Sequence, residues 1–145
     1  MKKQLVLEGI MALVKWDPSY SVKVVRCDED HKKLFALINT LHDAMLAGKG
    51  GEKVNQVVKE LGDYTKYHFS GEEGLMQKAN YPGLEGHKAL HREFEKKVDT
   101  FHADLKAGKG GNTIAVLEFL KNWLTAHIRQ VDQKYSGHLN AAGVV

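Results

Sequence analysis

The sequence predicts an all-α fold, an antiparallel up-down four-helix bundle preceded by an N-terminal arm. Three observations lead to this prediction: apolar residues recur with helical spacing in four segments, glycine and proline separate these segments, and one stretch is repeated. The 145 residues, of which 43% are apolar and 27% charged, suit a single globular domain with its own core. We expect the arm to cover residues 1–25, the bundle residues 26–137 and a tail residues 138–145.

The arm begins with MKKQLVLEGIMALVKW, which superficially resembles a signal peptide. Glu8 interrupts the apolar run and no small-residue cleavage site follows, so we interpret this stretch as a short extension. We expect the arm to pack on the bundle through Trp16. No segment approaches the roughly 20 apolar residues that span a bilayer, and we therefore expect no membrane partner.

Each of the four predicted helices carries apolar residues at the i, i+3, i+4, i+7 spacing of an amphipathic helix. No alternation typical of a strand competes over a comparable length. In chain order, the four stripes include Leu34, Ile38, Leu41 and Met45; Val54, Val57, Leu61 and Tyr64; Leu84, Phe94, Val98, Phe101 and Leu105; and Leu117, Leu120, Leu124 and Val131.

The segments between the predicted helices contain residues that end helices. AGKGG occurs after the first and the third, and glycine tolerates the left-handed conformation that closes a helix. NYPG (80–83) follows the second, where Pro82 prevents continuation. LHDAMLAGKGG (41–51) is echoed by FHADLKAGKGG (101–111), which indicates two similar helical hairpins. Short connections between long helices favour antiparallel neighbours.

Charge and cysteine content limit the partners and the compartment. The net charge is +3 and the lysines are scattered, so no basic patch suggests a nucleic-acid partner. The single cysteine, Cys27, cannot form a disulfide within the chain. That fits a reducing compartment, and we expect a cytoplasmic protein that is a monomer.

Every predicted helix also places metal-binding side chains on its apolar stripe. Alternate helices of an up-down bundle run in opposite directions, so these side chains lie at one end of the bundle and at similar height. They are His31 on the first helix, His68 and Glu72 on the second, His87 and His91 on the third, and His127 with Asp132 on the fourth.

A metal centre explains this set better than a polar core does. A single histidine on an apolar stripe is usually a hydrogen-bonded core residue. Burying several imidazoles and two carboxylates without a cation would cost free energy, on the order of several kcal/mol for each unpaired charge. A metal removes that cost, because it binds neutral histidine and ionised carboxylate.

The type and number of ligands favour two metal ions. Seven groups are too many for one tetrahedral zinc, whereas two bridging carboxylates would let them serve a pair of metals. Nitrogen and oxygen donors favour iron, with manganese, cobalt and zinc as weaker contenders. The sequence has no Glu-x-x-His motif, unlike carboxylate-rich di-iron bundles. Histidine-rich ligation should disfavour high-valent states and suit reversible dioxygen chemistry.

Four stretches together resemble the hemerythrin family, and most closely its single-domain bacterial members. The resemblance extends from Trp16 to Tyr135, and H-x-x-x-E, H-x-x-x-H and H-x-x-x-x-D occur in the family's order. Any one of these motifs alone would be weak. The matching stretches are DEDHKKLFALIN (28–39), HFSGEEGLM (68–76), HKALH (87–91) and HIRQVDQKY (127–135).

The resemblance implies a ligand set and an oxygen pocket. The centre would contain two non-heme iron ions bridged by both carboxylates and by a solvent-derived oxygen, and one iron would keep an open position for dioxygen. By resemblance, His87, His91 and His127 bind one iron, His31 and His68 bind the other, and Glu72 and Asp132 bridge them. Leu124 lies over the oxygen pocket, and its apolar walls are Phe69, Trp123 and Ile128.

The repeat relates Cys27 to the open position. An offset of 60 residues pairs His31 with His91 and Cys27 with His87, so cysteine stands where a third histidine would complete the second iron. The family usually has an apolar residue at this position. We expect Cys27 to be a buried small hydrophobe. The alternative is a thiol beside the open position, where it would ligate the iron or tune its reactivity.

Other positions lead to more local predictions. Asp30 replaces a glutamine common in the family, and we expect it to face solvent. We expect His42, His102 and His138 to lie on the surface. His127 and Asp132 would lie about 140° apart on an ideal helix. We therefore predict a π-type irregularity that lets both reach one centre.

The expected function is non-enzymatic: reversible binding of dioxygen for transport, storage or delivery to an oxygen-consuming enzyme. One alternative is an oxygen or redox sensor, although family sensors usually carry an output domain. Another is a di-iron redox enzyme, such as a peroxidase or an NO-handling protein, which would want a proton donor at the open position. Iron storage is disfavoured by a fixed two-metal ligand set.

Overall fold

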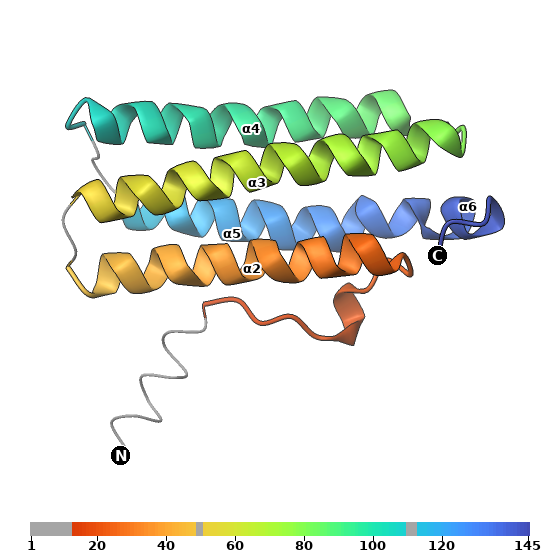
Figure 1. Ribbon diagram of the computed structural model, residues 1–145, viewed down its shortest axis with the longest axis horizontal. Coiled ribbons are helices and arrows are strands. Elements are labelled where there is room, and N and C mark those ends of the chain that lie inside the picture. Colours follow the sequence, from red (N-terminus) through yellow and green to blue (C-terminus); the bar gives the residue numbers. More distant parts are fainter. Residues whose placement is uncertain (1–12, 49–50, 110–112) are drawn as a thin grey trace, which may run out of the picture.

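The protein is a bundle of four long antiparallel helices, and their directions alternate along the chain (Figure 1). The computed structural model describes residues 13–48, 51–109 and 113–145. The predicted all-α four-helix bundle with an N-terminal segment is confirmed. The bundle helices are α2 (Val25–Leu46), α3 (Gly51–Lys78), α4 (Leu84–Lys106) and α5 (Thr113–Gln130), and the short helices are η1 (Pro18–Tyr20), η2 (Asp132–Tyr135) and α6 (Ser136–Ala141).

The helix ends follow from residues that adopt the left-handed conformation. Gly48 and Gly108, each just beyond the end of a bundle helix, have φ of 66° and 75°. These are the first glycines of the two AGKGG stretches, of which residues 49–50 and 110–111 lie outside the described part of the chain. After α3, Asn80 takes this role with φ of 54°, and Pro82 follows. Asparagine is among the few residues that tolerate such a backbone.

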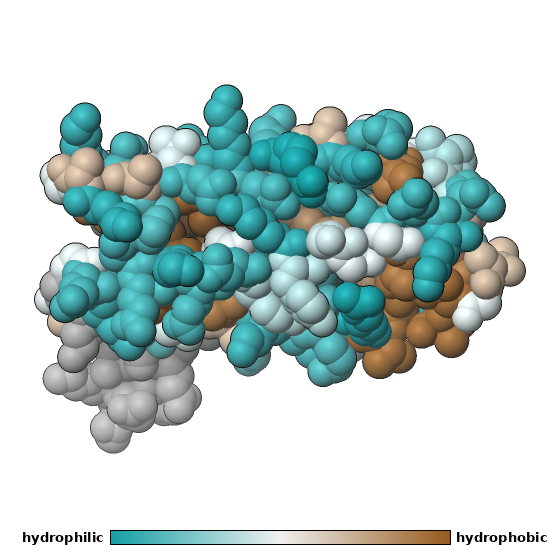
Figure 2. Space-filling model, turned by 45° about the horizontal axis from the view of Figure 1, so that its top comes forward, coloured by the Kyte–Doolittle hydropathy of each residue, from teal (hydrophilic) through white to brown (hydrophobic). Residues whose placement is uncertain are grey.

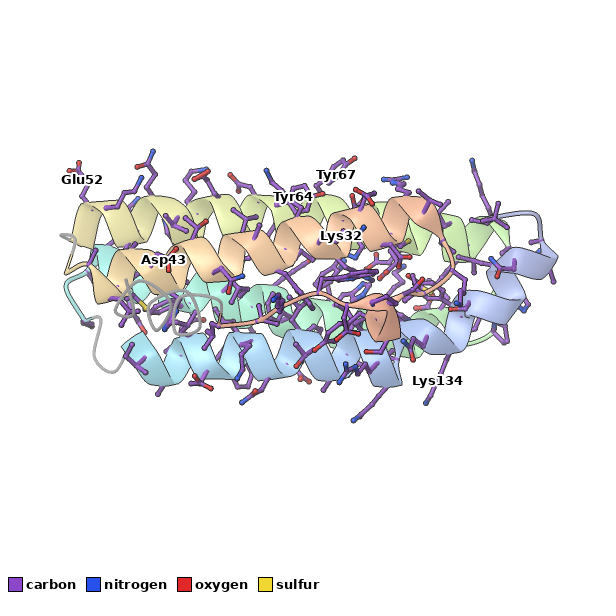
Figure 3. The ribbon with its side chains drawn as sticks, turned by 90° about the horizontal axis from the view of Figure 1, so that it is seen from below. Lys32, Asp43, Glu52, Tyr64, Tyr67 and Lys134 are labelled. Atoms are coloured by element: carbon purple, nitrogen blue, oxygen red, sulfur yellow. The ribbon has the colours of Figure 1, made fainter. Side chains whose placement is uncertain are left out.

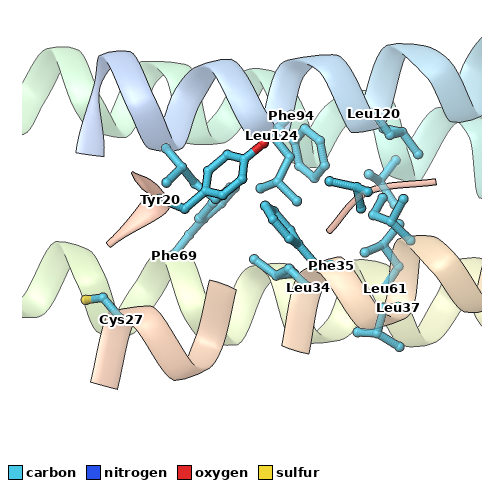
Figure 4. Packing of buried hydrophobic residues seen from close by; sticks show 14 of the residues in the cluster. Tyr20, Cys27, Leu34, Phe35, Leu37, Leu61, Phe69, Phe94, Leu120 and Leu124 are labelled. Carbon is cyan, nitrogen blue, oxygen red and sulfur yellow. The ribbon is translucent and has the colours of Figure 1, made fainter. Parts of the chain in front are cut away.

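The core lies along the bundle axis and is filled by the predicted stripes. Leu34, Ile38, Leu61 and Leu120 are all fully buried. Figure 4 shows such residues from facing helices meeting in the interior. The outer surface seen in Figure 2 is mostly hydrophilic, and hydrophobic residues show between the helices and toward one end. This pattern is expected of amphipathic helices that pack by their apolar faces.

The described part of the arm, from residue 13, packs along the bundle. The backbone NH of Val14 donates to Oδ1 of Asn39 (3.0 Å), and Nδ2 of Asn39 donates to the carbonyl of Val14 (2.8 Å). Trp16 is partly buried, whereas Val22 and Val24 are almost completely buried. The arm is therefore held by hydrogen bonds and several apolar side chains. Residues 1–12, which include the stretch around Glu8, lie outside the described residues.

The C-terminal residues also pack against the molecule. The residues expected to be a tail include most of α6, and Leu139 of α6 is fully buried. Ser136 Oγ donates to the carbonyl of Val22 (2.6 Å), which ties α6 to the arm at the end of the bundle. None of the described helices is long and apolar enough to cross a membrane.

Candidate metal centre

The structure brings the seven side chains selected from the sequence together inside one end of the bundle. They come from the start of α2, the second half of α3, the start of α4, the end of α5 and the start of η2. Each is at most 5% exposed. Their ligand atoms form two groups, each with all atoms within 4.8 Å of one another: Glu72, His87, His91, His127 and Asp132; and His31, His68 and Glu72.

The first group gathers three imidazoles around two carboxylates. Nε2 of His87 and Nε2 of His127 lie 2.9 and 3.0 Å from the same oxygen, Oδ1 of Asp132. These two nitrogens are 3.1 Å apart. Nε2 of His91 lies 3.1 Å from Oε1 of Glu72. All three imidazoles therefore present Nε2 to one small volume.

The second group contains two imidazoles and uses the other oxygens of the same carboxylates. Nε2 of His31 lies 3.2 Å from Oδ2 of Asp132 and 3.5 Å from Oε2 of Glu72. Nε2 of His68 lies 3.3 Å from Oε2 of Glu72. Each carboxylate thus offers one oxygen to each group, and the second group has one histidine fewer than the first.

Two further carboxylates bind the outer nitrogens of histidines in the two groups. Nδ1 of His91 lies 2.7 Å from Oε2 of Glu73, and Nδ1 of His68 lies 3.0 Å from Oδ2 of Asp30. An ionised carboxylate only accepts hydrogen bonds, so each Nδ1 carries a proton, and in the neutral imidazole Nε2 then keeps its lone pair. Metal-binding histidines are commonly oriented in this way.

The expectation that Asp30 faces solvent is wrong. The residue is only 8% exposed, and its carboxylate accepts hydrogen bonds from His68 and from the hydroxyl of Tyr64. A signal was available in the sequence. Asp30 lies three residues after Cys27 and four before Leu34, so helical spacing places it beside the buried stripe.

Tyr135 is a site residue that the sequence reasoning did not single out. It is completely buried, and its hydroxyl donates to Oε2 of Glu72 at 2.6 Å. Its position at the end of the fourth stripe was visible, but its hydrogen-bond partner comes from α3 and depends on how the helices pack.

Unpaired polar atoms provide the test of whether a metal fits. Among the described residues, no hydrogen-bond partner is found for either ring nitrogen of His31, Nε2 of His68 and His91, Oε1 of Glu72 or Oδ1 of Asp132. These atoms approach one another closely without the alignment that hydrogen bonds require. An unsatisfied buried group costs about 1–3 kcal/mol, and several together are rare. A pair of metal ions would satisfy the inward-facing atoms among them, which are the Nε2 nitrogens and the two carboxylate oxygens, so the residues fit a di-metal centre.

The charges of the group lead to the same conclusion. Burial opposes protonation of His31, but the carboxylates of Asp132 and Glu72 outweigh it and raise the pKa of His31 to about 10. Burial likewise opposes protonation of His87, and the same two carboxylates raise its pKa to about 9. Burial disfavours an ionised Glu72, but His68 and its neighbours hold the pKa of this carboxyl well below its ordinary value. The carboxylates therefore require positive charge, which either protons or metals supply.

Cys27 is a buried free thiol that lies outside both metal groups. Burial, with the charge of Glu72, raises its pKa far above the usual range, so it stays protonated. Its thiol lies close to the hydroxyl of Tyr135. Figure 4 shows Cys27 apart from Leu124 and Phe69, which were expected to share the oxygen pocket with it.

Two of the other expected pocket residues lie against histidines of the first group. The ring of Phe69 stacks on His91, with centroids 3.7 Å apart, and Trp123 stacks on His127 at 4.5 Å. Leu124 and Ile128 are buried, and Trp123 is partly buried. The centre is therefore enclosed by apolar side chains on this side.

Two further predictions about single elements are wrong. The chain shows no π-helical turn in its described part: α5 ends at Gln130, and η2 begins at Asp132 as a tighter 3₁₀ turn. Ending the helix redirects the chain between His127 and Asp132, so no widening of the helix is needed.

His42 is buried, with only 9% of it exposed, so it is not a surface residue. His102 is partly buried and His138 is exposed.

Comparisons with known proteins agree with this geometry. The family model described as Hemerythrin HHE cation binding domain matches residues 22–139. A bacteriohemerythrin of Stenotrophomonas maltophilia is 33% identical over 131 residues, which cover 90% of this chain and 84% of that protein. Myohemerythrin-1 of Phascolopsis gouldii is 34% identical over 125 residues, which cover 86% of this chain and 92% of that protein.

Solved structures share the fold as well as the sequence. The crystal structure of a wild-type hemerythrin has a TM-score of 0.82 and 31% identity, covering 88% of this chain and 98% of that one. The buried histidines and carboxylates, the bundle that holds them, and these similarities have one explanation. The chain belongs to the hemerythrin family.

Proposed function

We propose that this chain binds two iron ions through its seven buried ligands and binds dioxygen reversibly at the iron held by His31 and His68. The biological role would be transport, storage or delivery of dioxygen, without catalysis. The observation that supports this proposal is the asymmetry of the centre: Glu72 and Asp132 each contact histidines on both sides, but one side has three histidines and the other has two. The group with fewer ligands has room for an external molecule.

The donor set supports iron. Five imidazole nitrogens and two carboxylates, with no sulfur in either group, suit iron better than softer metals. Bound iron in its reduced state would supply the electrons that hold dioxygen. Glu72 and Asp132 would keep the two ions at a fixed separation, and Asp30 and Glu73 would hold His68 and His91 with Nε2 facing inward.

The surroundings of the centre favour a carrier over a catalyst. Phe69, Trp123 and Leu124 present apolar groups that would exclude water and slow the loss of a reduced oxygen species. The hydroxyl of Tyr135 already donates to Glu72, and burial with the charge of Glu72 raises the pKa of Tyr135 well above its usual value. The thiol of Cys27 is also held protonated. Neither group is a ready proton donor for turnover.

Anaerobic loading with ferrous iron tests this proposal. The protein is exposed to air and then re-equilibrated under argon while the absorption spectrum and the iron content per chain are followed. We expect two irons per chain and a charge-transfer band that appears with dioxygen and disappears on its removal. An irreversible change to an oxidised spectrum would contradict a carrier role and support the redox-enzyme or sensor alternatives.

A further inference from the structure

The carboxylate behind His68 has two hydrogen-bond donors from α3. Oδ2 of Asp30 accepts from Nδ1 of His68 at 3.0 Å, and Oδ1 accepts from the hydroxyl of Tyr64 at 2.9 Å. His68 is 1% exposed and Asp30 is 8% exposed, so water screens this pair weakly. Tyr64 and Asp30 therefore form a hydrogen-bonded chain that ends at a ligand of the second metal group.

The first metal group has a matching carboxylate with a different partner. Oε2 of Glu73 lies 2.7 Å from Nδ1 of His91 and 2.5 Å from the guanidinium nitrogen of Arg92. Arginine carries a full positive charge, which offsets the charge of Glu73. The second partner of Asp30 is a neutral hydroxyl, so more of its negative charge acts on the histidine.

Arg26 does not remove this difference. Its guanidinium lies over Gly71 and 5.8 Å from the centre of the Tyr67 ring. Among the described residues no hydrogen bond joins Arg26 to Asp30, and Arg26 acts on that carboxylate only through space. Arg26 is exposed, and an exposed charge that acts through space is screened more strongly than a hydrogen-bonded one.

We propose that Asp30 and Tyr64 are positioning residues that set the reduction potential of the iron bound by His31 and His68. This inference rests on the proposed di-iron function. Asp30 would draw the Nδ1 proton of His68, increase the electron density on Nε2 and so favour the oxidised metal. Tyr64 would limit this effect by sharing the charge of Asp30. The balance between them would decide how readily the open iron loses its electron to dioxygen.

Tyr64 is placed so that its hydroxyl can be removed with little disturbance of the fold. It is partly buried, and it lines a surface groove of about 340 Å³ with Lys33, Leu37 and Tyr67. Figure 3 shows Tyr64 and Tyr67 on the same part of α3. Tyr67 is 56% exposed and has no hydrogen bond to Asp30, so it provides a matched control.

The test measures the reduction potential of iron-loaded variants. Asp30→Asn keeps an acceptor oxygen for His68 but removes the charge, so the potential should rise and autoxidation should slow. Tyr64→Phe removes the donor and leaves the charge on His68, so the potential should fall and autoxidation should accelerate. Tyr67→Phe should change neither. A merely structural role would shift the Asp30 and Tyr64 variants in the same direction or not at all.

A second measurement uses the metal-free protein and the affinity for ferrous iron. Nitrogen-15 NMR of labelled histidine should show a protonated Nδ1 at His68 in the wild type, with this signal lost in Asp30→Ala. The same variant should bind iron about 10–100-fold more weakly, with Asp30→Asn recovering part of the loss.

The two proposals fail in different ways. If the wild type binds dioxygen reversibly but the Asp30→Asn and Tyr64→Phe potentials do not move in opposite directions, only the present inference is overturned. If the wild type holds no pair of irons, both the proposed function and this inference are overturned.

Discussion

Glu72 is the residue on which the two metal groups depend most directly. It is completely buried in the bundle, and its two oxygens contact different groups: Oε1 is 3.1 Å from His91, and Oε2 is 3.3 Å from His68. Asp132 also contacts histidines of both groups, but Glu72 alone belongs to both groups of closely spaced ligand atoms. A residue with these contacts cannot be replaced by a shorter side chain without separating the groups.

Glu72→Ala should therefore abolish binding of the metal pair. We expect fewer than two irons per chain and no charge-transfer band after anaerobic loading, because both ions lose a ligand at once. His102→Ala is the matched control, since His102 lies outside both groups and is partly exposed. If Glu72→Ala retained two irons per chain, the proposed ligand set would be incorrect.

Cys27 shows how a buried side chain near a metal site can be structural. Its thiol is outside both groups of ligand atoms and lies close to the hydroxyl of Tyr135, which donates to Glu72. This arrangement favours the interpretation of Cys27 as a small buried side chain over that of an iron ligand.

Cys27→Ala should leave two irons per chain and an unchanged spectrum. The free energy of unfolding should fall by about 1 kcal/mol, because the variant loses one buried side-chain atom. Denaturant titration measures the stability, and iron content measures the site. A lost or shifted charge-transfer band would instead indicate a thiol that acts on the open iron.

At the level of elements, the junction between α5 and η2 determines where Asp132 points. α5 ends at Gln130, and the backbone NH of Val131 still donates to the carbonyl of His127 at 2.8 Å. The next hydrogen bond, from Lys134 to Val131 at 3.1 Å, closes a tighter turn. This change of helix type brings the Asp132 carboxylate back to the imidazole of His127.

Insertion of one alanine after Gln130 should remove Asp132 from the centre. One helical residue rotates the following side chain by about 100°, so the carboxylate would face away. We expect normal helix content by circular dichroism and loss of the metal pair. An alanine inserted after Gly143, beyond α6, should preserve both, and equal metal content in the two variants would argue against a fixed register at this junction.

At the level of the whole molecule, the four helices enclose a buried site whose charges balance only with protons or metals. In the metal-free protein, the carboxylates raise the pKa of His31 to about 10 and of His87 to about 9, against the effect of burial. Histidine in an unfolded chain has a pKa of about 6.5. The folded state therefore binds more protons than the unfolded state over a wide alkaline range.

This difference predicts a pH dependence for the metal-free protein. The contribution of these histidines to stability is complete below about pH 6.5 and is lost as the pH rises toward 9–10. We expect a lower denaturant midpoint at pH 9.5 than at pH 6. Bound iron replaces the protons, so the loaded protein should lose less stability over this range, and loading at pH 7 should release protons. An equal pH dependence in both forms would contradict this balance.

Much of the fold and of the candidate site could be predicted because helical periodicity is a local property. For a residue such as His87 or Phe94, apolar neighbours three and four positions away indicate that it lies on the buried face of its helix. The up-down topology then determines which helix ends lie at the same level of the bundle. The same reasoning selected the seven buried side chains of the candidate centre. It also misplaced Asp30 and His42, which lie near the edge of a stripe, where spacing does not separate buried from exposed.

The sequence by itself determined the helices, their order and the types of side chain that face inward, because backbone geometry sets a period that apolar residues follow. Only the tertiary structure decided which side chains meet across helices. Asp30 with His68, Glu73 with His91 and Tyr135 with Glu72 are such pairs. Their partners are far apart in sequence, so their contacts depend on the axial register and rotation that packing gives each helix. Such pairings, which local spacing does not encode, orient the side chains of the candidate centre and set the charge around them.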